Sequence, residues 1–333
     1  MPRIAIIPGD GVGPEIIEAV LPVLEAASDK HGIPLELKFY EAGDLTKERR
    51  GAALPSDTFE GVRKADATLM VAIGETAREV ILPLRQKLDL YVNLRPAKSY
   101  PVPNAVQGFH VTIVRENTEG LYVRAGWSSE YAALDLRVIT RHGSERIARF
   151  GYRYAKENGL SRVYVVHKAN VLRGCQLFRE VCHRIAEEEG FEYREMYVDA
   201  AAMRLAMDRP FDLIITTNMF GDILADLAAA YIGGLGMYPS GNIGEDNAIF
   251  EPVHGTAPDI AGKGIANPMA TILSAAMMFR WLGFVRVADD IERAVWKACE
   301  MGYTTPDVGG KMRAREVGNK ILELLSSSNH KDV

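Results

Sequence analysis

The sequence predicts an α/β fold, because short apolar runs typical of buried strands alternate with longer runs of helical periodicity. Its 333 residues are 47% hydrophobic and 25% charged, which is ordinary for a globular protein and sufficient for two domains or one large α/β unit. The first strand and the first helix are joined by a glycine-rich turn. These three observations favour a sheet with helices packed on it.

The first strand is predicted over residues 3–8 and the first helix from residue 15 to about residue 30, with Gly9-Asp10-Gly11-Val12-Gly13-Pro14 between them. Such a turn suggests a Rossmann dinucleotide site. We reject that interpretation because the full G-x-G-x-x-G spacing is missing, Pro14 occupies the helix start, and no acidic residue follows a second strand at the required distance. Further strands are predicted at residues 35–40, 68–73, 105–114, 163–167, 192–198 and 213–217.

Composition excludes several classes of protein. The apolar runs are too short and too interrupted for a transmembrane helix, and residues 1–10 lack a secretory signal, so we expect a cytoplasmic protein that does not bind a membrane. Cys175, Cys182 and Cys299 are odd in number and lack C-x-x-C spacing, which argues against disulfides or a zinc site. A net charge of −5 gives no reason to expect a nucleic-acid partner.

Two carboxylates stand out near the middle of the chain. A buried strand at residues 211–217 precedes an Ala/Leu-rich helix that ends at Gly233-Gly234, so Asp222 and Asp226 fall four apart on one helical face. Unpaired like charges at this spacing disfavour a helix, and a divalent cation would remove the conflict. The alternative is an acidic face that is simply solvated, which is common in surface helices.

Arginines cluster in two stretches that lie earlier in the chain. Arg85 and Arg95 lie ten residues apart, and Arg115 ends an apolar strand. A guanidinium is a rigid fork of donors that suits carboxylate, so three of them near a metal would describe a polycarboxylate site. From spacing alone, each is better explained as a surface or salt-bridge residue.

Five stretches together resemble the β-decarboxylating dehydrogenases, the family of isocitrate, homoisocitrate, 3-isopropylmalate and tartrate dehydrogenases. The resemblance covers nearly the whole chain. The stretches are Asn93-Leu94-Arg95-Pro96, Arg115-Glu116-Asn117-Thr118-Glu119-Gly120-Leu121-Tyr122, His167-Lys168-Ala169-Asn170-Val171-Leu172, the run from Thr217 to Asp226, and the run from Glu251 to Gly262.

The resemblance implies a role for each matched residue. Asp222 and Asp226 would bind Mg²⁺ or Mn²⁺ together with Asp199 from a partner subunit. Arg85, Arg95 and Arg115 would bind substrate carboxylates, while Tyr122 and Lys168 would be the acid/base pair, with the lysine also supplied by the partner. The implied cofactor site is formed by Asn170, Glu251, His254, Gly255, Thr256, Ala257, Asp259, Ile260 and Asn267.

The implied fold is a two-domain isopropylmalate/isocitrate dehydrogenase-like fold with a large, mixed, twisted sheet. Its first, cofactor-side domain comprises residues 1–98 and 233–333, and its second, which carries dimerisation and the metal site, comprises residues 99–232. The shared active site implies a homodimer or homotetramer. NAD is expected rather than NADP, because Asp259 can accept from the ribose 2′-hydroxyl and repels a 2′-phosphate.

The implied reaction is oxidation of a 2-hydroxy-3-carboxy acid by hydride transfer to NAD, followed by loss of CO₂. Thr76 and Arg78 are available for a distal carboxylate, whereas Val80 and Leu82 offer an apolar surface for an isopropyl group. The stretches Asn117-Thr118-Glu119 and Pro239-Ser240-Gly241-Asn242-Ile243-Gly244 favour homoisocitrate, with isocitrate also used and 3-isopropylmalate as the alternative. A metal-dependent hydrolase and a non-catalytic regulatory subunit remain as alternatives of another class.

Overall fold

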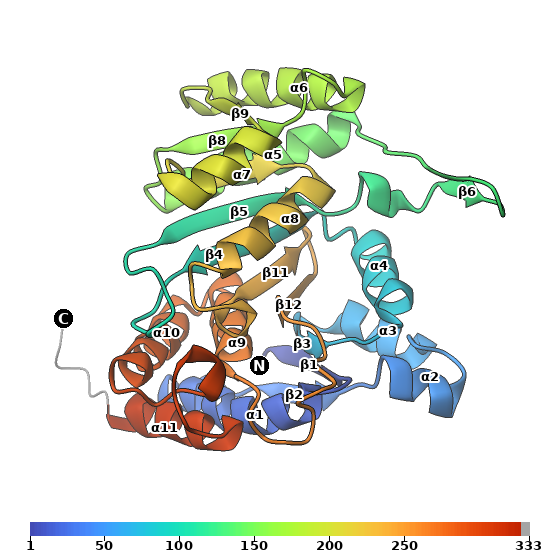
Figure 1. Cartoon of the computed structure of the whole chain (residues 1–333). Helices are drawn as coiled ribbons and strands as arrows, with labels where there is room; N and C mark the ends of the chain where they lie inside the picture. The colour runs from blue at the N-terminus through green and yellow to red at the C-terminus, as the bar shows by residue number, and fades with distance from the viewer. Residues whose placement is uncertain (328–333) are drawn as a thin grey trace.

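The structure, a computed structural model, describes residues 1–327 and confirms the α/β class. One ten-stranded mixed sheet runs through the molecule, with helices on both faces, and a small hairpin projects from its side (Figure 1). The strands are β1 (Arg3–Gly9), β2 (Glu36–Phe39), β3 (Ala67–Ala72), β4 (Val92–Lys98), β5 (His110–Glu116), β6 (Gly126–Ser128), β7 (Ala133–Asp135), β8 (Val163–His167), β9 (Glu195–Tyr197), β10 (Leu213–Thr216), β11 (Pro239–Ile243) and β12 (Ala248–Pro252).

The helices alternate with these strands along most of the chain. They are α1 (Gly13–Lys30), α2 (Asp44–Arg50), α3 (Ser56–Lys64), α4 (Ala77–Lys87), α5 (Arg141–Glu157), α6 (Arg173–Glu189), α7 (Val198–Met207), α8 (Asn218–Ala229), α9 (Met269–Trp281), α10 (Val285–Glu300) and α11 (Ala314–Ser327), with short 3₁₀ turns η1 (Leu121–Val123), η2 (Leu235–Met237) and η3 (Pro306–Val308). Among residues 1–327 no helix is both long and apolar enough to cross a membrane.

The strand order is β2-β1-β3-β12-β11-β4-β5-β10-β8-β9. Both ends of the sheet are parallel, whereas β11 and β4 run antiparallel to their neighbours in the centre. This mixed sheet confirms that the fold is not a Rossmann fold, in which the strands are mostly parallel.

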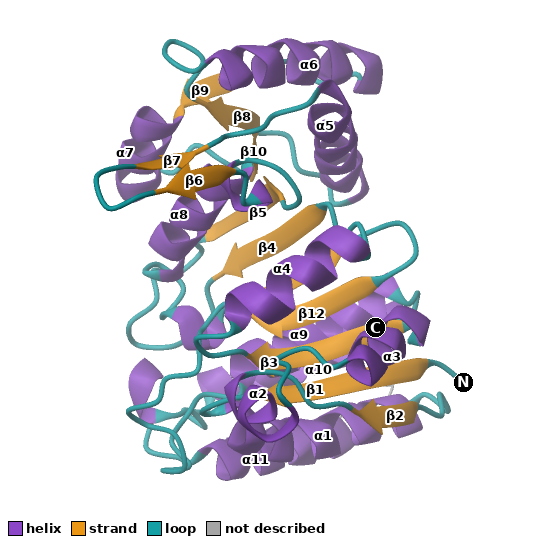
Figure 2. Cartoon of the chain, turned by 90° about the vertical axis from the view of Figure 1, so that its right-hand side faces the viewer, coloured by secondary structure: helices purple, strands orange, loops and turns teal. Residues whose placement is uncertain are grey.

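Strand alternation divides the core between the two faces of the sheet. In β1, Ile4 and Ile6 pack into the main core with α1, α9 and α10, while Ala5 and Ile7 pack into a second core with α3 and α4. Figure 2 shows α4 in front of the central strands and α9 and α10 behind them.

The first and the last described helices, α1 and α11, pack against each other in one half of the molecule, where β12 also pairs with β3 (Figure 1). Residues 99–232 form most of the other half. The proposed division of the chain at residues 98 and 232 agrees with this arrangement and remains a prediction.

Three central strands escaped prediction, and two predicted strands were too long, since the strand expected at residues 192–198 is only Glu195–Tyr197. The unpredicted β4 contains Pro96, and the unpredicted β11 and β12 flank a turn; the β11 sequence Pro-Ser-Gly-Asn-Ile has the composition of a loop. The strand expected at residues 105–114 begins only at His110, because Gly108 takes a left-handed conformation with φ of +74°.

Candidate active site

Three buried arginines converge from three different elements. Arg85 lies on α4, Arg95 on β4 and Arg115 at the end of β5, and their residues are 8%, 7% and 1% exposed. The antiparallel pairing of β4 and β5 places Arg95 and Arg115 close to one another along neighbouring strands. The structure brings the three arginines together, and their role in binding substrate carboxylates stays a prediction.

Asp222 on α8 faces these arginines. Its Oδ1 accepts from Arg115, lies 3.2 Å from Arg95 Nη1, and its Oδ2 accepts from the Tyr122 hydroxyl at 3.0 Å. Burial alone would raise the pKa of Asp222, but the Arg115 and Arg95 guanidiniums outweigh burial and lower it. The expectation that Asp222 would be an unpaired charge is thus wrong, because Arg95 and Arg115 already neutralise its carboxylate.

Asp226 lies one turn further along α8, and its side chain is 65% exposed with Oδ1 3.9 Å from Arg95 Nη1. Two carboxylates on one helical face, with room for substrate oxygens, are the donor set that Mg²⁺ or Mn²⁺ requires. Within residues 1–327 no cluster of three or more His, Cys, Asp or Glu side chains is placed to hold a metal. A third protein carboxylate must therefore come from elsewhere if one is used.

Lys168 and Asp199 form a separate pair, with Lys168 Nζ 2.5 Å from Asp199 Oδ1. In the described part of the chain neither is recorded in contact with the arginines, Tyr122 or Asp222. Asn170, two residues beyond Lys168, is exposed. One chain thus brings together only part of the predicted site, as expected if a partner supplies the lysine and the third aspartate.

The arginines have unused hydrogen-bonding capacity. Within residues 1–327, the buried Nε groups of Arg85 and Arg95 have no hydrogen-bond acceptor. Orphaned buried donors are costly unless a ligand satisfies them. The three guanidiniums are balanced by Asp222, Asp226 and Glu251, so a dianionic substrate that arrives with a divalent cation leaves the net charge of the site unchanged.

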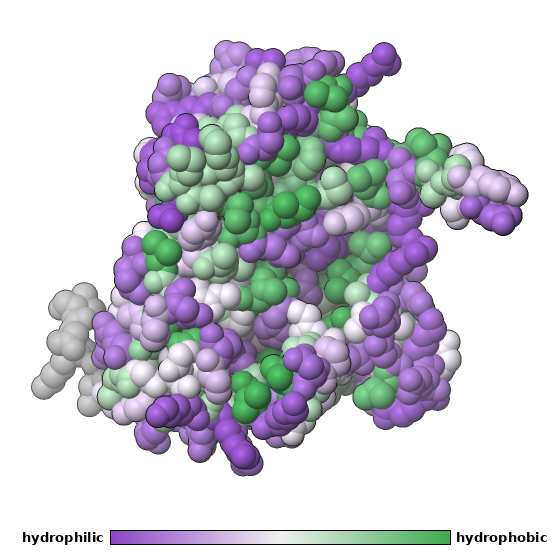
Figure 3. Space-filling model, in the orientation of Figure 1, coloured by the Kyte–Doolittle hydropathy of each residue, from purple (hydrophilic) through white to green (hydrophobic). Residues whose placement is uncertain are grey.

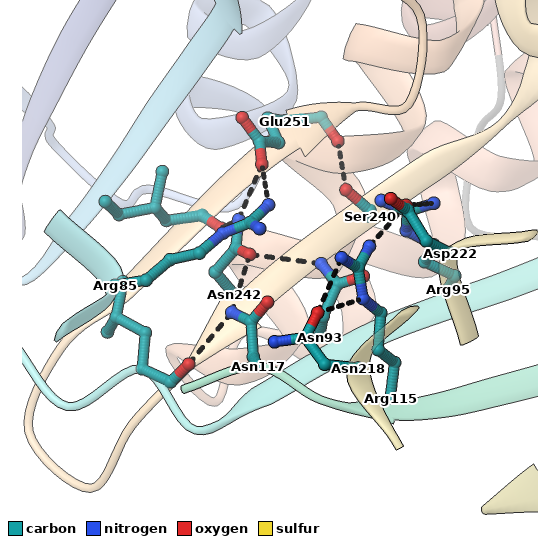
Figure 4. A network of polar contacts seen from close by, with 12 residues as sticks. Arg85, Asn93, Arg95, Arg115, Asn117, Asn218, Asp222, Ser240, Asn242 and Glu251 are labelled. Atoms are coloured by element: carbon teal, nitrogen blue, oxygen red, sulfur yellow. Dashed lines mark hydrogen bonds and ion pairs between the residues drawn. The ribbon is translucent and has the colours of Figure 1, made fainter. Parts of the chain in front are cut away.

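A layer of buried amides supports the arginines (Figure 4). Asn218 Oδ1 accepts from Arg115 Nε at 3.1 Å and Nη2 at 2.8 Å, which fixes the guanidinium from below. Beside it, Asn242 bonds to Asn93, Asn117 and Glu251. The sequence alone predicts no role for the four asparagines, although each lies inside one of the family-like stretches or the Pro239–Gly244 stretch.

The glycine-rich turn after β1 supports the predicted cofactor loop, residues 251–260. Val12 N donates to Thr256 O at 3.0 Å, and a Cβ on Gly11 would lie 2.2 Å from that oxygen. Ala257 adopts a left-handed φ of 40°, and Gly255 and Asp259 are exposed. The turn therefore has a packing role, which explains its glycines without a Rossmann site.

The other predicted cofactor residues differ in their freedom to bind. His254 Nδ1 donates to Gly255 O at 2.9 Å, and burial lowers the pKa of this imidazole, which favours the neutral ring. Ile260 is half-buried. Glu251 and the Asn267 side chain are engaged internally, the latter with Met269 N and Asp307 Oδ2.

The segment before Arg85 departs from expectation at two residues. The Thr76 hydroxyl donates to Asp44 Oδ1 at 2.7 Å, so it is not free to donate to a distal substrate carboxylate. Val80 is 0% exposed inside the second core and cannot face a substrate. Arg78 is exposed and lies two helical turns from Arg85 on the same face, with Leu82 half-buried between them.

The family model described as isocitrate/isopropylmalate dehydrogenase matches residues 3–321. The chain belongs to this family. A 3-isopropylmalate dehydrogenase from Archaeoglobus fulgidus is 48% identical over 98% of this chain and 100% of its own. An isocitrate/homoisocitrate dehydrogenase from Thermus thermophilus is 47% identical over 98% and 99%. The crystal structure of an isocitrate dehydrogenase from Methylococcus capsulatus superposes with a TM-score of 0.93 at 40% identity, covering 98% of this chain and 99% of that one.

Membership of the isocitrate/isopropylmalate dehydrogenase family makes the protein a β-decarboxylating dehydrogenase that acts on a small molecule and uses a nicotinamide cofactor and a divalent metal. The chain supplies residues that fit both groups, namely the carboxylates of α8 and the loop of residues 251–260. The relatives carry different substrate names at nearly the same identity, so overall similarity does not separate the substrates.

Proposed function

We propose that the protein catalyses the NAD-dependent oxidative decarboxylation of 3-isopropylmalate. The observation that carries the reaction class is the set of three buried arginines opposite the carboxylates of α8. The substrate choice revises the sequence-based preference for homoisocitrate because the Thr76 hydroxyl, expected to meet a distal carboxylate, is occupied by Asp44. This choice agrees with the name of the Archaeoglobus relative. The stretches that had favoured homoisocitrate contribute Asn117 and Asn242 to the buried amide layer instead.

The arginines orient the substrate. Two carboxylates of a 2-hydroxy-3-carboxy acid can accept from Arg85, Arg95 and Arg115, whose planar donors fix the angle of each carboxylate. The unpartnered Nε groups of Arg85 and Arg95 gain acceptors in this complex. Fixing both ends of a short molecule holds C2 and C3 in one place, which is how positioning lowers the barrier.

Two residues handle protons. Tyr122, held by Asp222 and with its pKa raised by burial, remains protonated and can deliver a proton to C3 after CO₂ leaves. Lys168 of the partner subunit accepts the proton of the C2 hydroxyl. Asp222, Asp226 and Asp199 of the partner subunit would hold Mg²⁺ or Mn²⁺, which would supply Lewis acidity, and the loop of residues 251–260 would hold NAD as the hydride acceptor.

NAD is proposed over NADP because of Asp259. Its carboxylate is exposed in the cofactor loop and has no ion-pair partner within the described residues. A free carboxylate there can accept from ribose hydroxyls and repels a 2′-phosphate.

A homodimer is proposed from exposed apolar side chains. Met203 and Met207 on α7 and Ile223 on α8 are 55%, 68% and 58% exposed, and Figure 3 shows hydrophobic atoms gathered over these helices. The projecting hairpin adds Trp127, which is 57% exposed. Contiguous apolar surface of this kind marks a protein interface, and it lies beside Asp199, the residue that a partner would supply.

Turnover of a substrate panel tests the proposal. The purified protein is assayed with 3-isopropylmalate, homoisocitrate, isocitrate and tartrate, each with NAD and NADP and with Mg²⁺ or Mn²⁺. The highest kcat/KM is expected with 3-isopropylmalate and NAD. Reduction of neither cofactor with any substrate would overturn the reaction class, and faster turnover of homoisocitrate would overturn only the substrate.

Homoisocitrate remains a second candidate because Arg78 is exposed on the substrate-facing side of α4 with no recorded acceptor among residues 1–327. Arg78→Leu should lower kcat/KM for homoisocitrate by about 10- to 100-fold if Arg78 meets a distal carboxylate, and should spare 3-isopropylmalate. A matched control is Arg49→Leu. This change removes an exposed arginine of nearby α2, which pairs with Glu41.

A further inference from the structure

One buried side chain, Asn242 on β11, bonds to Glu251, the residue that connects the cofactor loop to Arg85. Its Oδ1 accepts from Asn93 Nδ2 and Asn117 Nδ2, each at 3.0 Å, and its Nδ2 donates to Glu251 Oε1 at 2.7 Å and to Ile249 O at 3.4 Å. Asn242 is 1% exposed. All four hydrogen-bonding positions of this amide are therefore filled, which leaves it one orientation.

Glu251 carries this order to the substrate side. The Glu251 oxygen that accepts from Asn242 also lies 3.4 Å from Arg85 Nη2 (Figure 4). Glu251 provides the only carboxylate recorded as an ion-pair partner of Arg85 among residues 1–327. A buried guanidinium needs such a counter-charge, so the place of Glu251 decides the place of Arg85.

Glu251 is the last residue but one of β12, where the cofactor loop begins. We propose that Asn242 is a positioning residue, which sets the Glu251 carboxylate and through it holds Arg85 and the cofactor loop in register. This inference rests on the proposed function, because it assigns Arg85 to the substrate and the loop to NAD. It adds a role for Asn93, Asn117 and Asn242, which touch neither substrate nor cofactor in that scheme.

The energetics favour a positioning role over a purely structural one. Apolar side chains in place of the asparagines would pack between these central strands and leave no buried polar group without a partner. Replacing a buried polar network in this way often leaves protein stability unchanged or raises it. Instead, the network ends on the one charged pair that joins α4 to β12. Disturbing the network is therefore expected to change the affinity for substrate and NAD more than the free energy of unfolding.

Asn242→Ala tests the proposal, with Ser240→Ala as its matched control. Ser240 lies on the same strand, is equally buried, and donates its hydroxyl hydrogen to Glu251 O at 2.8 Å. Ser240→Ala therefore also removes one buried hydrogen bond to Glu251, but that bond holds the main chain and not the carboxylate. We expect Asn242→Ala to raise KM for the hydroxy acid about tenfold with a smaller change in kcat. Ser240→Ala should leave KM within about twofold.

A double-mutant cycle shows whether Asn242 acts through Glu251. Glu251→Gln keeps the shape of the side chain and removes its charge, so it should also raise KM, and adding Asn242→Ala to it should have little further effect. Calorimetric binding of NAD gives a readout that needs no turnover, and it should weaken in Asn242→Ala but not in Ser240→Ala.

Equal effects of the two alanine variants on KM and NAD binding would overturn the proposal, as would additive effects in the cycle. If Asn242→Ala does not fold, Asn242→Ser replaces it, because a serine hydroxyl is too short to reach Glu251. Failure of the wild type in the substrate panel would instead count against the proposed reaction, and the NAD measurement still decides the role of Asn242.

Discussion

Asp222 is held by two arginines and a tyrosine before any metal binds. Asp222→Asn should abolish metal-dependent turnover, because a neutral amide is a poor ligand for a hard cation. Titration of activity with Mg²⁺ and with Mn²⁺ measures the effect, and thermal unfolding shows whether the fold survives. Asp226→Asn is the comparison: its side chain is more exposed and its arginine contact longer, so turnover should fall with less change in stability. Normal activity of Asp222→Asn at low metal would remove this residue from the metal site.

The cofactor preference depends on one short segment of the loop. Asp259→Lys combined with Ile260→Tyr should move the kcat/KM ratio from NAD towards NADP, because the exposed carboxylate is replaced by a cation that attracts a 2′-phosphate. Initial rates with each cofactor at fixed substrate measure the ratio. An unchanged ratio would mean that the ribose does not lie beside Asp259.

Sequence reasoning at the residue scale found charged groups and missed neutral ones. Arg115 and Asp222 could be predicted because buried or paired charges require a reason, and the structure brings them together. Asn218 and Asn242 could not, since an asparagine is as common in turns as in buried networks. Thr76 was given a substrate role that its bond to Asp44 prevents, and no sequence signal announces that bond.

At the scale of elements, β8 and β10 could be predicted from their continuous apolar residues. The central β11 was missed because Pro239, Ser240, Gly241 and Asn242 resemble a turn. Its buried position explains the composition: a Cβ on Gly241 would lie 2.9 Å from the Phe250 ring, and Asn242 is needed beneath the arginines.

Subunit complementation tests how the two halves of the site are combined. Tyr122→Phe and Lys168→Ala should each lose about 10²- to 10⁴-fold in kcat, because each removes one proton-transfer group. If the lysine comes from the partner subunit, unfolding and refolding an equal mixture of the two variants should recover activity, to about a quarter of the wild type for random dimers. Recovery no greater than the sum of the variants would place both residues in one subunit.

The projecting hairpin, β6 and β7, should serve the same assembly. Replacing Trp127, Leu134 and Leu136 by serine should shift the protein towards monomers in light scattering and lower kcat with it, since exposed apolar side chains of this kind gain by being covered. A fully active monomer would contradict the shared site.

At the scale of the whole molecule, Asp290 links α10 to the end of α1, two helices far apart in the sequence. Its Oδ2 lies 2.8 Å from Lys30 Nζ and 3.0 Å from His31 Nε2 at the end of α1, and Arg293 pairs with its other oxygen. Burial would raise the pKa of Asp290, but the hydrogen bonds from Lys30 and His31 outweigh it and lower the pKa. Because the pKa of Asp290 is lower in the folded than in the unfolded state, the ionised carboxylate stabilises the fold at pH values above the unfolded-state pKa. This stabilisation is lost as pH falls through the folded-state pKa.

Asp290→Asn should therefore reduce the free energy of unfolding by roughly 1–3 kcal/mol at pH 7. Its difference from the wild type should begin to shrink as pH falls below about 4, where the Asp290 carboxylate of the unfolded chain becomes protonated, and should disappear below the lowered pKa of the folded state. Thermal or urea unfolding at several pH values measures this. Asp289→Asn is the control, because Asp289 is an exposed neighbour paired with Arg280, and it should change little. A constant difference down to pH 3 would contradict the assignment.

The insertion of β12 between β3 and β11 has a consequence for synthesis of the chain. When β3 leaves the ribosome its inner edge has no partner, because β12 is encoded far downstream. At about 5–20 residues per second this open edge persists for on the order of ten seconds. An unpaired strand such as β3, whose six residues are all buried in the folded protein, is a template for aggregation. The nascent protein is therefore expected to depend on chaperones until residue 252 has emerged, and truncation before β12 should yield aggregates while leaving the codons for every predicted arginine intact.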